Sequence, residues 1–158
     1  MANPSYITDV VSCLKEKGLH ISLAESCTGG LACAKLVSVS GASNILNESY
    51  VTYANESKIK ILGVSADSIE RFGVVSEEVA REMAQGVAMT SGAEVGVGIT
   101  GIAGPDGGTP EKPVGTVCFG FFINGEIFSK TAHLSGDRTK IRESAANYVF
   151  EALCELLK

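Results

Sequence analysis

Residues 94–100, EVGVGIT, form a nearly continuous run of small apolar residues, and this run limits the possible folds more than any other segment. A strand of this kind is buried on both faces, so helices must cover the sheet on either side of it. Helical patterns precede and separate the other predicted strands. The simplest arrangement is therefore an α/β fold with a mixed sheet between helical layers.

The hydrophobic patterns predict one domain over residues 1–158. Periodicity predicts helices over 5–18, 31–37, 57–62, 65–72, 76–90 and 136–158, and strands over 20–24, 50–54, 94–100, 114–123 and 126–134. Ser76 is a suitable N-cap for its helix. Asn124-Gly125 separates the last two strands, and this dipeptide is typical of a two-residue hairpin. The chain is thus expected to finish with a C-terminal β-hairpin followed by a long helix.

Charge and hydropathy exclude several classes of partner. The formal net charge is −5, from 13 basic and 18 acidic side chains, whereas a nucleic-acid-binding module usually has a basic face. No apolar run approaches the ~20 residues that a bilayer-spanning helix needs. The start of the sequence, MANPSYITDV, lacks the pattern of a secretory signal. We therefore expect a cytoplasmic protein that binds neither nucleic acid nor membrane.

The cysteines and histidines do not form a metal-binding pattern. The five cysteines include no C-x-x-C pair, and His20 and His133 are isolated in the sequence. A disulfide framework and a structural zinc site are both disfavoured by these spacings. We expect no metal and no cofactor.

The segment 25–30, ESCTGG, lies where the first predicted strand passes into a helix. Ligands of open α/β sheets bind at the carboxyl ends of strands, and free N–H groups at the start of a helix attract anions. Ser26 and Thr28 supply hydroxyl groups there, while Gly29 and Gly30 allow close approach to the backbone. The alternative is that one of the hydroxyls only caps the helix.

Two further segments contain residues suited to chemistry. Glycine and proline fill half of the loop 100–113, TGIAGPDGGTPEKP, and such long loops are either functional or mobile. Lys58 is a candidate proton acceptor for Ser26, because Ser–Lys is a known nucleophile–base pair and histidines are scarce. The alternative for Lys58 is a solvated helix face. Cys27 is a rival nucleophile, for which a buried apolar role is expected.

Six segments together resemble the C-terminal domain of the competence/damage-inducible protein family CinA. They are AESCTGG at 24–30, YVTYANESK at 50–58, GVVSEEVAREMA at 73–84, TGIAGPDGG at 100–108, KPVGTV at 112–117 and SGDR at 135–138. Stand-alone members of this family are nicotinamide-nucleotide amidases. The resemblance implies a three-layer α/β/α domain, a homo-oligomer, and metal-free hydrolysis of nicotinamide mononucleotide to nicotinic acid mononucleotide and ammonia. Many relatives also have a large N-terminal domain, whose activities are not carried over.

The resemblance also implies roles for individual residues. Ser26 is expected to be the nucleophile and Lys58 the base. The residues expected to line the substrate pocket are Thr28, Gly29, Gly30, Ser43, Tyr53, Thr100, Gly101 and Arg138. Free N–H groups at the start of the last helix favour an anion, so Arg138 is expected to bind the 5′-phosphate there; the alternative is a surface ion pair with Asp137 or Glu143.

Two functions other than catalysis are compatible with the same resemblance. One is a non-catalytic nucleotide-binding or regulatory domain that keeps the pocket without turnover. An intact Ser26–Lys58 pair disfavours it, because binding alone needs neither residue. The other is a protein partner in competence or DNA-damage responses, for which the negative charge makes direct DNA binding unfavourable.

Overall fold

Five strands form one mixed sheet in the order β2-β1-β3-β4-β5 in the computed structural model, which describes residues 4–158. Their bounds are β1 Ile21–Glu25, β2 Leu46–Val51, β3 Val95–Gly101, β4 Thr116–Ile123 and β5 Glu126–His133. β1 pairs in parallel with both β2 and β3, whereas β4 is antiparallel to β3 and to β5. The parallel half of the sheet therefore has the carboxyl ends of three strands along one edge.

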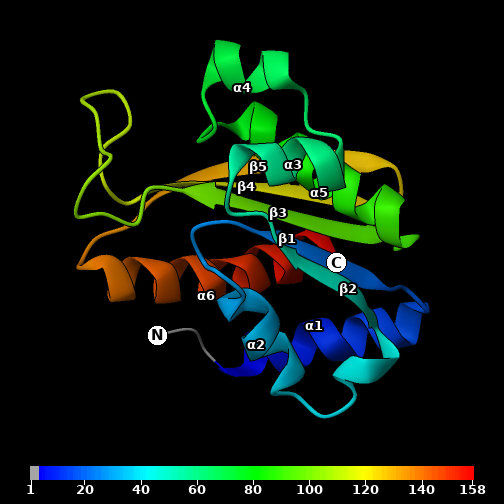
Figure 1. Ribbon diagram of the computed structural model, residues 1–158. Helices are drawn as coiled ribbons and strands as arrows, with labels where there is room; N and C mark the ends of the chain where they lie inside the picture. The colour runs from blue at the N-terminus through cyan, green and yellow to red at the C-terminus, as the bar shows by residue number, and fades with distance from the viewer. Residues whose placement is uncertain (1–3) are drawn as a thin grey trace.

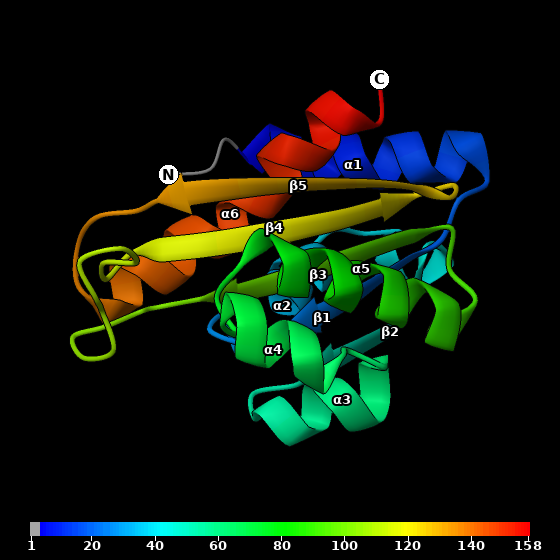
Figure 2. The same cartoon turned by 90° about the horizontal axis from the view of Figure 1, so that it is seen from above.

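Helices cover both faces of this sheet (Figures 1 and 2). On one face lie α1 (Pro4–Lys17), α2 (Leu31–Val37) and α6 (Arg138–Leu156). On the other lie α3 (Asn55–Leu62), α4 (Ala66–Phe72) and α5 (Glu77–Ser91), and a short 3-10 helix, η1 (Ala42–Asn44), precedes β2. The predicted three-layer α/β/α sandwich with a C-terminal hairpin and long helix is confirmed.

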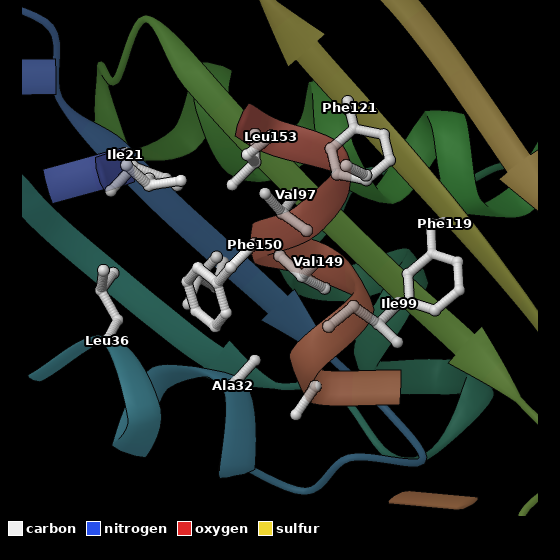
Figure 3. Packing of buried hydrophobic residues seen from close by; sticks show 14 of the residues in the cluster. Ile21, Ala32, Leu36, Val97, Ile99, Phe119, Phe121, Val149, Phe150 and Leu153 are labelled. Atoms are coloured by element: carbon white, nitrogen blue, oxygen red, sulfur yellow. The ribbon is translucent and has the colours of Figure 1, made fainter. Parts of the chain in front are cut away.

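The larger core lies between the sheet and the layer containing α6. Phe150 and Leu153 of α6 belong to one buried cluster with Ile99 of β3 and Phe119 of β4 (Figure 3). All four side chains are fully buried. Because successive residues of a strand face opposite sides, the residues that alternate with these on β3 and β4 face α5 instead.

Glycines on the α5 side of the sheet let this helix approach the strands closely. Gly98 and Gly120 are register partners on β3 and β4. A Cβ atom placed on either glycine would lie 2.5 Å or 2.0 Å, respectively, from the Ala80 carbonyl oxygen of α5. The small residues of the 94–100 run are therefore required by the packing of α5 against the sheet.

The predicted strand over 50–54 is wrong in its position. β2 spans Leu46–Val51 and is an edge strand, on which Asn47 and Glu48 are exposed. A strand paired on one side only needs little apolar alternation, so its first half gave no hydrophobic signal. The chain leaves the sheet at Thr52, and α3 begins at Asn55 instead of residue 57.

Two local predictions are confirmed by the backbone. Ser76 caps α5 by accepting a hydrogen bond from the Val79 N–H. Asn124 and Gly125 both have positive φ, 48° and 89°, as a two-residue hairpin loop of this kind requires.

Candidate active site

The candidate site lies at the carboxyl ends of β1, β2 and β3. The chain leaves β1 toward β2 on one side, while β3 lies on the other side of β1. The crevice at such a reversal of strand order is the usual ligand site of an open α/β sheet. Ser26 directly follows β1, and its N–H donates to the Ile99 carbonyl of β3 at 3.1 Å. The serine is thus attached to both strands that border the crevice.

A tight turn over residues 26–30 connects β1 to α2. The Gly29 N–H donates to the Ser26 carbonyl at 3.0 Å, and Gly29 and Gly30 have φ of 59° and 100°. These left-handed conformations favour glycine. The backbone therefore reverses immediately after Ser26 and leaves its side chain facing the crevice.

The first turn of α2 is capped by Glu25 and not by a hydroxyl group. The N-cap residue Gly30 has no side chain, and the Glu25 carboxylate accepts the N–H groups of Ala32 and Cys33 at 2.9 and 3.0 Å. Glu25 is fully buried. A negative charge at a helix N-terminus is stabilising. The alternative that Ser26 or Thr28 merely caps this helix is therefore wrong.

Lys58 of α3 is fully buried and directed at the serine. Its Nζ lies 3.2 Å from Ser26 Oγ, 2.6 Å from the Thr52 carbonyl oxygen and 3.3 Å from the Tyr53 carbonyl oxygen. Burial lowers the pKa of Lys58 below its ordinary value. The alternative of a solvated lysine is wrong.

These three neighbours can accept the three N–H groups of a charged amine, and they also fit the neutral amine. A neutral primary amine has two N–H groups and one lone pair. The carbonyls of Thr52 and Tyr53 can accept both N–H groups, which leaves the lone pair for the Ser26 hydroxyl proton. The arrangement can therefore remove a proton from Ser26, which is the requirement for a serine nucleophile.

Cys27 is adjacent to the serine but is poorly suited to attack. It is buried, and burial raises the pKa of its thiol to about 11, an effect that the nearby positive charges of Arg142 and Lys58 only partly offset. Because the thiolate is the nucleophilic form, a thiol with this pKa is almost entirely unreactive at neutral pH. The geometry therefore favours Ser26 over Cys27.

A pocket of about 460 Å³ opens above the serine and the lysine. Six of the ten predicted site residues line it, namely Ser26, Tyr53, Lys58, Thr100, Gly101 and Arg138. Thr100 is fixed by a hydrogen bond from its hydroxyl to the Val74 carbonyl at 2.9 Å. The structure thus brings together residues that are distributed over more than 100 positions of the sequence.

The other four predicted residues do not line this pocket. Thr28 is fully buried within the turn, and its hydroxyl has no hydrogen-bond partner in the described part of the chain. Gly29 and Gly30 form the same turn through their positive φ angles. Ser43 is exposed on η1. Their predicted contact with substrate stays a prediction.

Arg138 closes the pocket on the side of α6. Its guanidinium donates to the Gly104 carbonyl at 2.7 Å and to the Tyr53 hydroxyl at 3.1 Å. It forms no ion pair with Asp137 or Glu143 within residues 4–158, and Asp137 instead caps α6. The ion-pair alternative for Arg138 is therefore wrong. Residues 101–109 of the glycine-rich loop form much of the remaining wall.

Several residues of the site carry no signal in the sequence. Glu25 lies within a strand, and the helix it caps starts six residues later. Arg142 of α6 contacts the turn over residues 26–30, which we call the nucleophile turn. The only sequence signal for this role is that Arg142 lies one helical turn after Arg138. Lys112 and Asp106 also line the pocket.

The described residues contain neither a metal-binding cluster nor a membrane-spanning helix. Between residues 4 and 158, no group of three or more His, Cys, Asp or Glu side chains is arranged to hold a metal ion. No helix in the same range is both long and apolar enough to cross a bilayer.

Comparisons with known proteins place this architecture beside one group of bacterial proteins. A family model described as the CinA C-terminal domain matches residues 4–157. A CinA-like protein of Kosmotoga olearia is 51% identical over 142 residues, which are 90% of this chain and 34% of the relative. A putative competence-damage inducible protein of Caldicellulosiruptor saccharolyticus is 48% identical, over 91% of this chain and 35% of its own length. The chain spans about a third of the length of the curated relatives it matches.

Solved structures of similar length share the fold. The crystal structure of a competence-damaged protein (CinA) superfamily protein from Klebsiella pneumoniae has a TM-score of 0.94 and 31% identity, covering 99% of this chain and 98% of that one. The competence/damage inducible protein CihA from Agrobacterium tumefaciens has a TM-score of 0.93 and 36% identity, covering 98% and 95%.

Proposed function

The chain belongs to the CinA C-terminal domain family, and on this premise we propose that it is a nicotinamide-nucleotide amidase. The reaction is hydrolysis of the carboxamide of nicotinamide mononucleotide to nicotinic acid mononucleotide and ammonia. The resemblance of the sequence to stand-alone members of the family supplies the substrate. The site geometry supports the reaction class, which is amide hydrolysis by a serine nucleophile.

One observation carries the proposal, which is the contact of a buried lysine with a serine hydroxyl. Lys58 Nζ lies 3.2 Å from Ser26 Oγ, inside a pocket large enough for a small molecule. A nucleophile and a base at this distance are the signature of covalent catalysis. Because burial lowers the pKa of Lys58, more of the amine is neutral near physiological pH than for a solvated lysine.

In the acylation step, Ser26 Oγ attacks the carbonyl carbon while Lys58 takes the hydroxyl proton. The tetrahedral intermediate then needs donors for its oxyanion, and free backbone N–H groups beside the serine are suited to this. The backbone N–H of Thr28 has no backbone acceptor among residues 4–158 and is available for this role. Loss of one oxyanion donor typically reduces kcat by about 100- to 1000-fold.

In the second half of the reaction, Lys58 returns the proton. The protonated amine donates it to the leaving nitrogen as the C–N bond breaks, so that ammonia departs and an acyl-enzyme ester remains on Ser26. Water, deprotonated by the neutral Lys58, then attacks the ester, and the ester C–O bond breaks as Lys58 returns this proton to Ser26 Oγ, which releases nicotinic acid mononucleotide. One base serves both halves, as general acid–base catalysis allows.

The remaining pocket residues suit a nucleotide. Arg138 stands at the pocket wall with a guanidinium that no carboxylate of the described chain neutralises. Guanidinium groups bind phosphate through paired N–H donors. We assign Arg138 to the 5′-phosphate of the substrate.

Ammonia release from nicotinamide mononucleotide tests the proposal directly. The wild-type chain should release ammonia and nicotinic acid mononucleotide in equal amounts, whereas Ser26→Ala and Lys58→Ala should each remove turnover but retain nucleotide binding. The double variant should lose little more than either single one, because groups that act as a unit are non-additive. Near-normal ammonia release by Ser26→Ala would refute the covalent route.

The same experiment separates catalysis from the alternative of a non-catalytic nucleotide-binding domain. That alternative expects the wild-type chain to bind nicotinamide mononucleotide without product formation. A binding site has no need for a buried lysine against a serine hydroxyl, since a buried amine is costly to fold. The contact therefore favours the amidase.

A further inference from the structure

Arg142 binds two successive carbonyl groups of the nucleophile turn. Its Nε donates to the Cys27 carbonyl and its Nη2 to the Thr28 carbonyl, both at 2.9 Å. The arginine lies on α6, more than 110 positions further along the chain. These two residues directly follow Ser26, so the contact connects the last helix with the turn that presents the nucleophile.

The guanidinium is suited to this contact in a way that an ammonium is not. Its planar shape presents N–H groups in a fixed fork, so one side chain can hold two neighbouring acceptors. Arg142 forms no ion pair with a carboxylate in the described range, and its charge is directed at the carbonyls. A Cβ atom on Gly29 would lie 3.2 Å from its Nη2, so the turn also leaves room for the group.

By holding these carbonyls, Arg142 also sets the direction of the N–H groups in the same peptide units. In a trans peptide the carbonyl and the N–H point in opposite directions. The carbonyl of Cys27 faces Arg142, so the N–H of Thr28 faces away from it, and this N–H has no acceptor among the described residues. In the next peptide unit, the Thr28 carbonyl faces Arg142 and the Gly29 N–H donates to the Ser26 carbonyl.

We propose that Arg142 is a positioning residue of the amidase, a role that rests on the proposed function. It fixes the planes of the Cys27–Thr28 and Thr28–Gly29 peptide units. The serine hydroxyl thereby stays within reach of Lys58, and the free N–H of Thr28 keeps a fixed orientation beside the nucleophile. Arg142 does not touch the substrate and acts only through the turn.

Substitution of Arg142 should lower kcat more than it raises KM. A displacement of about 1 Å at a nucleophile can cost on the order of 100-fold in rate, so Arg142→Ala should lose about 10- to 100-fold in kcat. Arg142→Lys should recover only part of this, because a flexible ammonium lacks the planar fork that fixes the direction of both hydrogen bonds. Arg81→Ala is the matched control, since Arg81 is also a partly buried helical arginine with polar partners, Ser129 and Glu78, but has no contact with the turn that follows Ser26.

Chemical rescue distinguishes positioning from a general loss of stability. Guanidinium ion at millimolar concentration, far below the molar range that unfolds small proteins, should restore part of the activity of Arg142→Ala. It should not change Arg81→Ala. A kcat of Arg142→Ala within twofold of wild type would overturn the proposal, and so would a loss that guanidinium does not restore in a folded variant. If Arg142→Ala does not fold, a wild-type kcat in Arg142→Lys would overturn it.

A serine-reactive probe keeps this test independent of the natural substrate. A fluorophosphonate should label Ser26 of the wild-type chain, as intact mass spectrometry can follow, and labelling of Arg142→Ala should be about 10- to 100-fold slower. Labelling without ammonia release in the wild type would count against the amidase and leave Arg142 testable. Equal labelling rates in wild type and Arg142→Ala would overturn the role of Arg142.

Discussion

A buried lysine acts as a base near neutral pH only when its surroundings disfavour the charged form. Lys58 is in this situation, since it is fully buried and forms no ion pair within residues 4–158. Its neighbours are two carbonyls and one hydroxyl, which also accommodate a neutral amine. Protonation of this one nitrogen should therefore control the reaction.

The pH dependence of kcat/KM should report the titration of Lys58. Because burial lowers the pKa of Lys58, the neutral fraction, and with it kcat/KM, should rise with pH and level off below the ordinary lysine pKa. Below the Lys58 pKa, kcat/KM should fall about tenfold per pH unit. Rate measurements on wild type over a range of pH give the profile, and a circular dichroism signal that stays constant over the same range is the control. A profile without an ascending limb would contradict Lys58 as the base.

Cys27→Ala should retain most of the amidase activity. The thiol has a pKa of about 11 because of burial, so it contributes almost no thiolate at neutral pH. The change removes only a small buried group, and initial rates of ammonia release measure the effect. A folded but inactive Cys27→Ala would return the thiol to consideration as the nucleophile.

At the scale of elements, the sequence predicted the buried strand and the helices that surround it, but not the edge strand. β3 is recognisable because Gly96 and Gly98 alternate with apolar residues that the core requires. β2 has polar residues along an exposed edge, so hydrophobic periodicity placed it four residues too late.

For the candidate site, residue patterns indicated the serine and the lysine but not the residues that hold them in place. Ser26 and Lys58 belong to recognisable segments, and the fold brings them into contact. Arg142 stands in an amphipathic helix, where any arginine is compatible with a solvated face. Its role depends on where α6 crosses the turn, which only the packed structure determines.

Arg138→Ala should raise KM for nicotinamide mononucleotide more than it lowers kcat. Arg138 begins α6 and lines the pocket, but the phosphate it is assigned to is remote from the reacting carboxamide. Comparison of kcat/KM for nicotinamide mononucleotide and nicotinamide riboside measures the effect, and the preference for the nucleotide should shrink. An unchanged preference would leave Arg138 as a link between α6, Gly104 and Tyr53 only.

Gly120→Ala should destabilise the packing of α5 on the sheet. The added Cβ would lie 2.0 Å from the Ala80 carbonyl oxygen, so the helix must move. Overpacking of this kind costs about 1–3 kcal/mol or more in the free energy of unfolding. Urea denaturation measures it, with Glu126→Ala at an exposed position of the neighbouring strand as the control. Equal midpoints for Gly120→Ala and wild type would contradict the close contact.

At the scale of the whole molecule, the reaction should need no metal ion. The proposed steps use one hydroxyl, one amine and backbone N–H groups, and the carboxylate among the pocket-lining residues belongs to Asp106 alone. Ammonia release should therefore survive dialysis against excess chelator, whereas a zinc-dependent amidase assayed in parallel should lose its activity. Activity lost to chelator and restored by a divalent cation would contradict the Ser–Lys route.

The position of Arg142 on the last helix has a consequence for how this chain is made. A ribosome synthesises Ser26 and Lys58 long before it reaches α6, so a growing chain holds the nucleophile and its base without the side chain that binds the turn. If Arg142 acts as proposed, the serine becomes fully reactive only after α6 has docked. The order of residues along the chain then delays the chemistry until translation of this domain is complete, and an interrupted translation product would carry a serine of low reactivity.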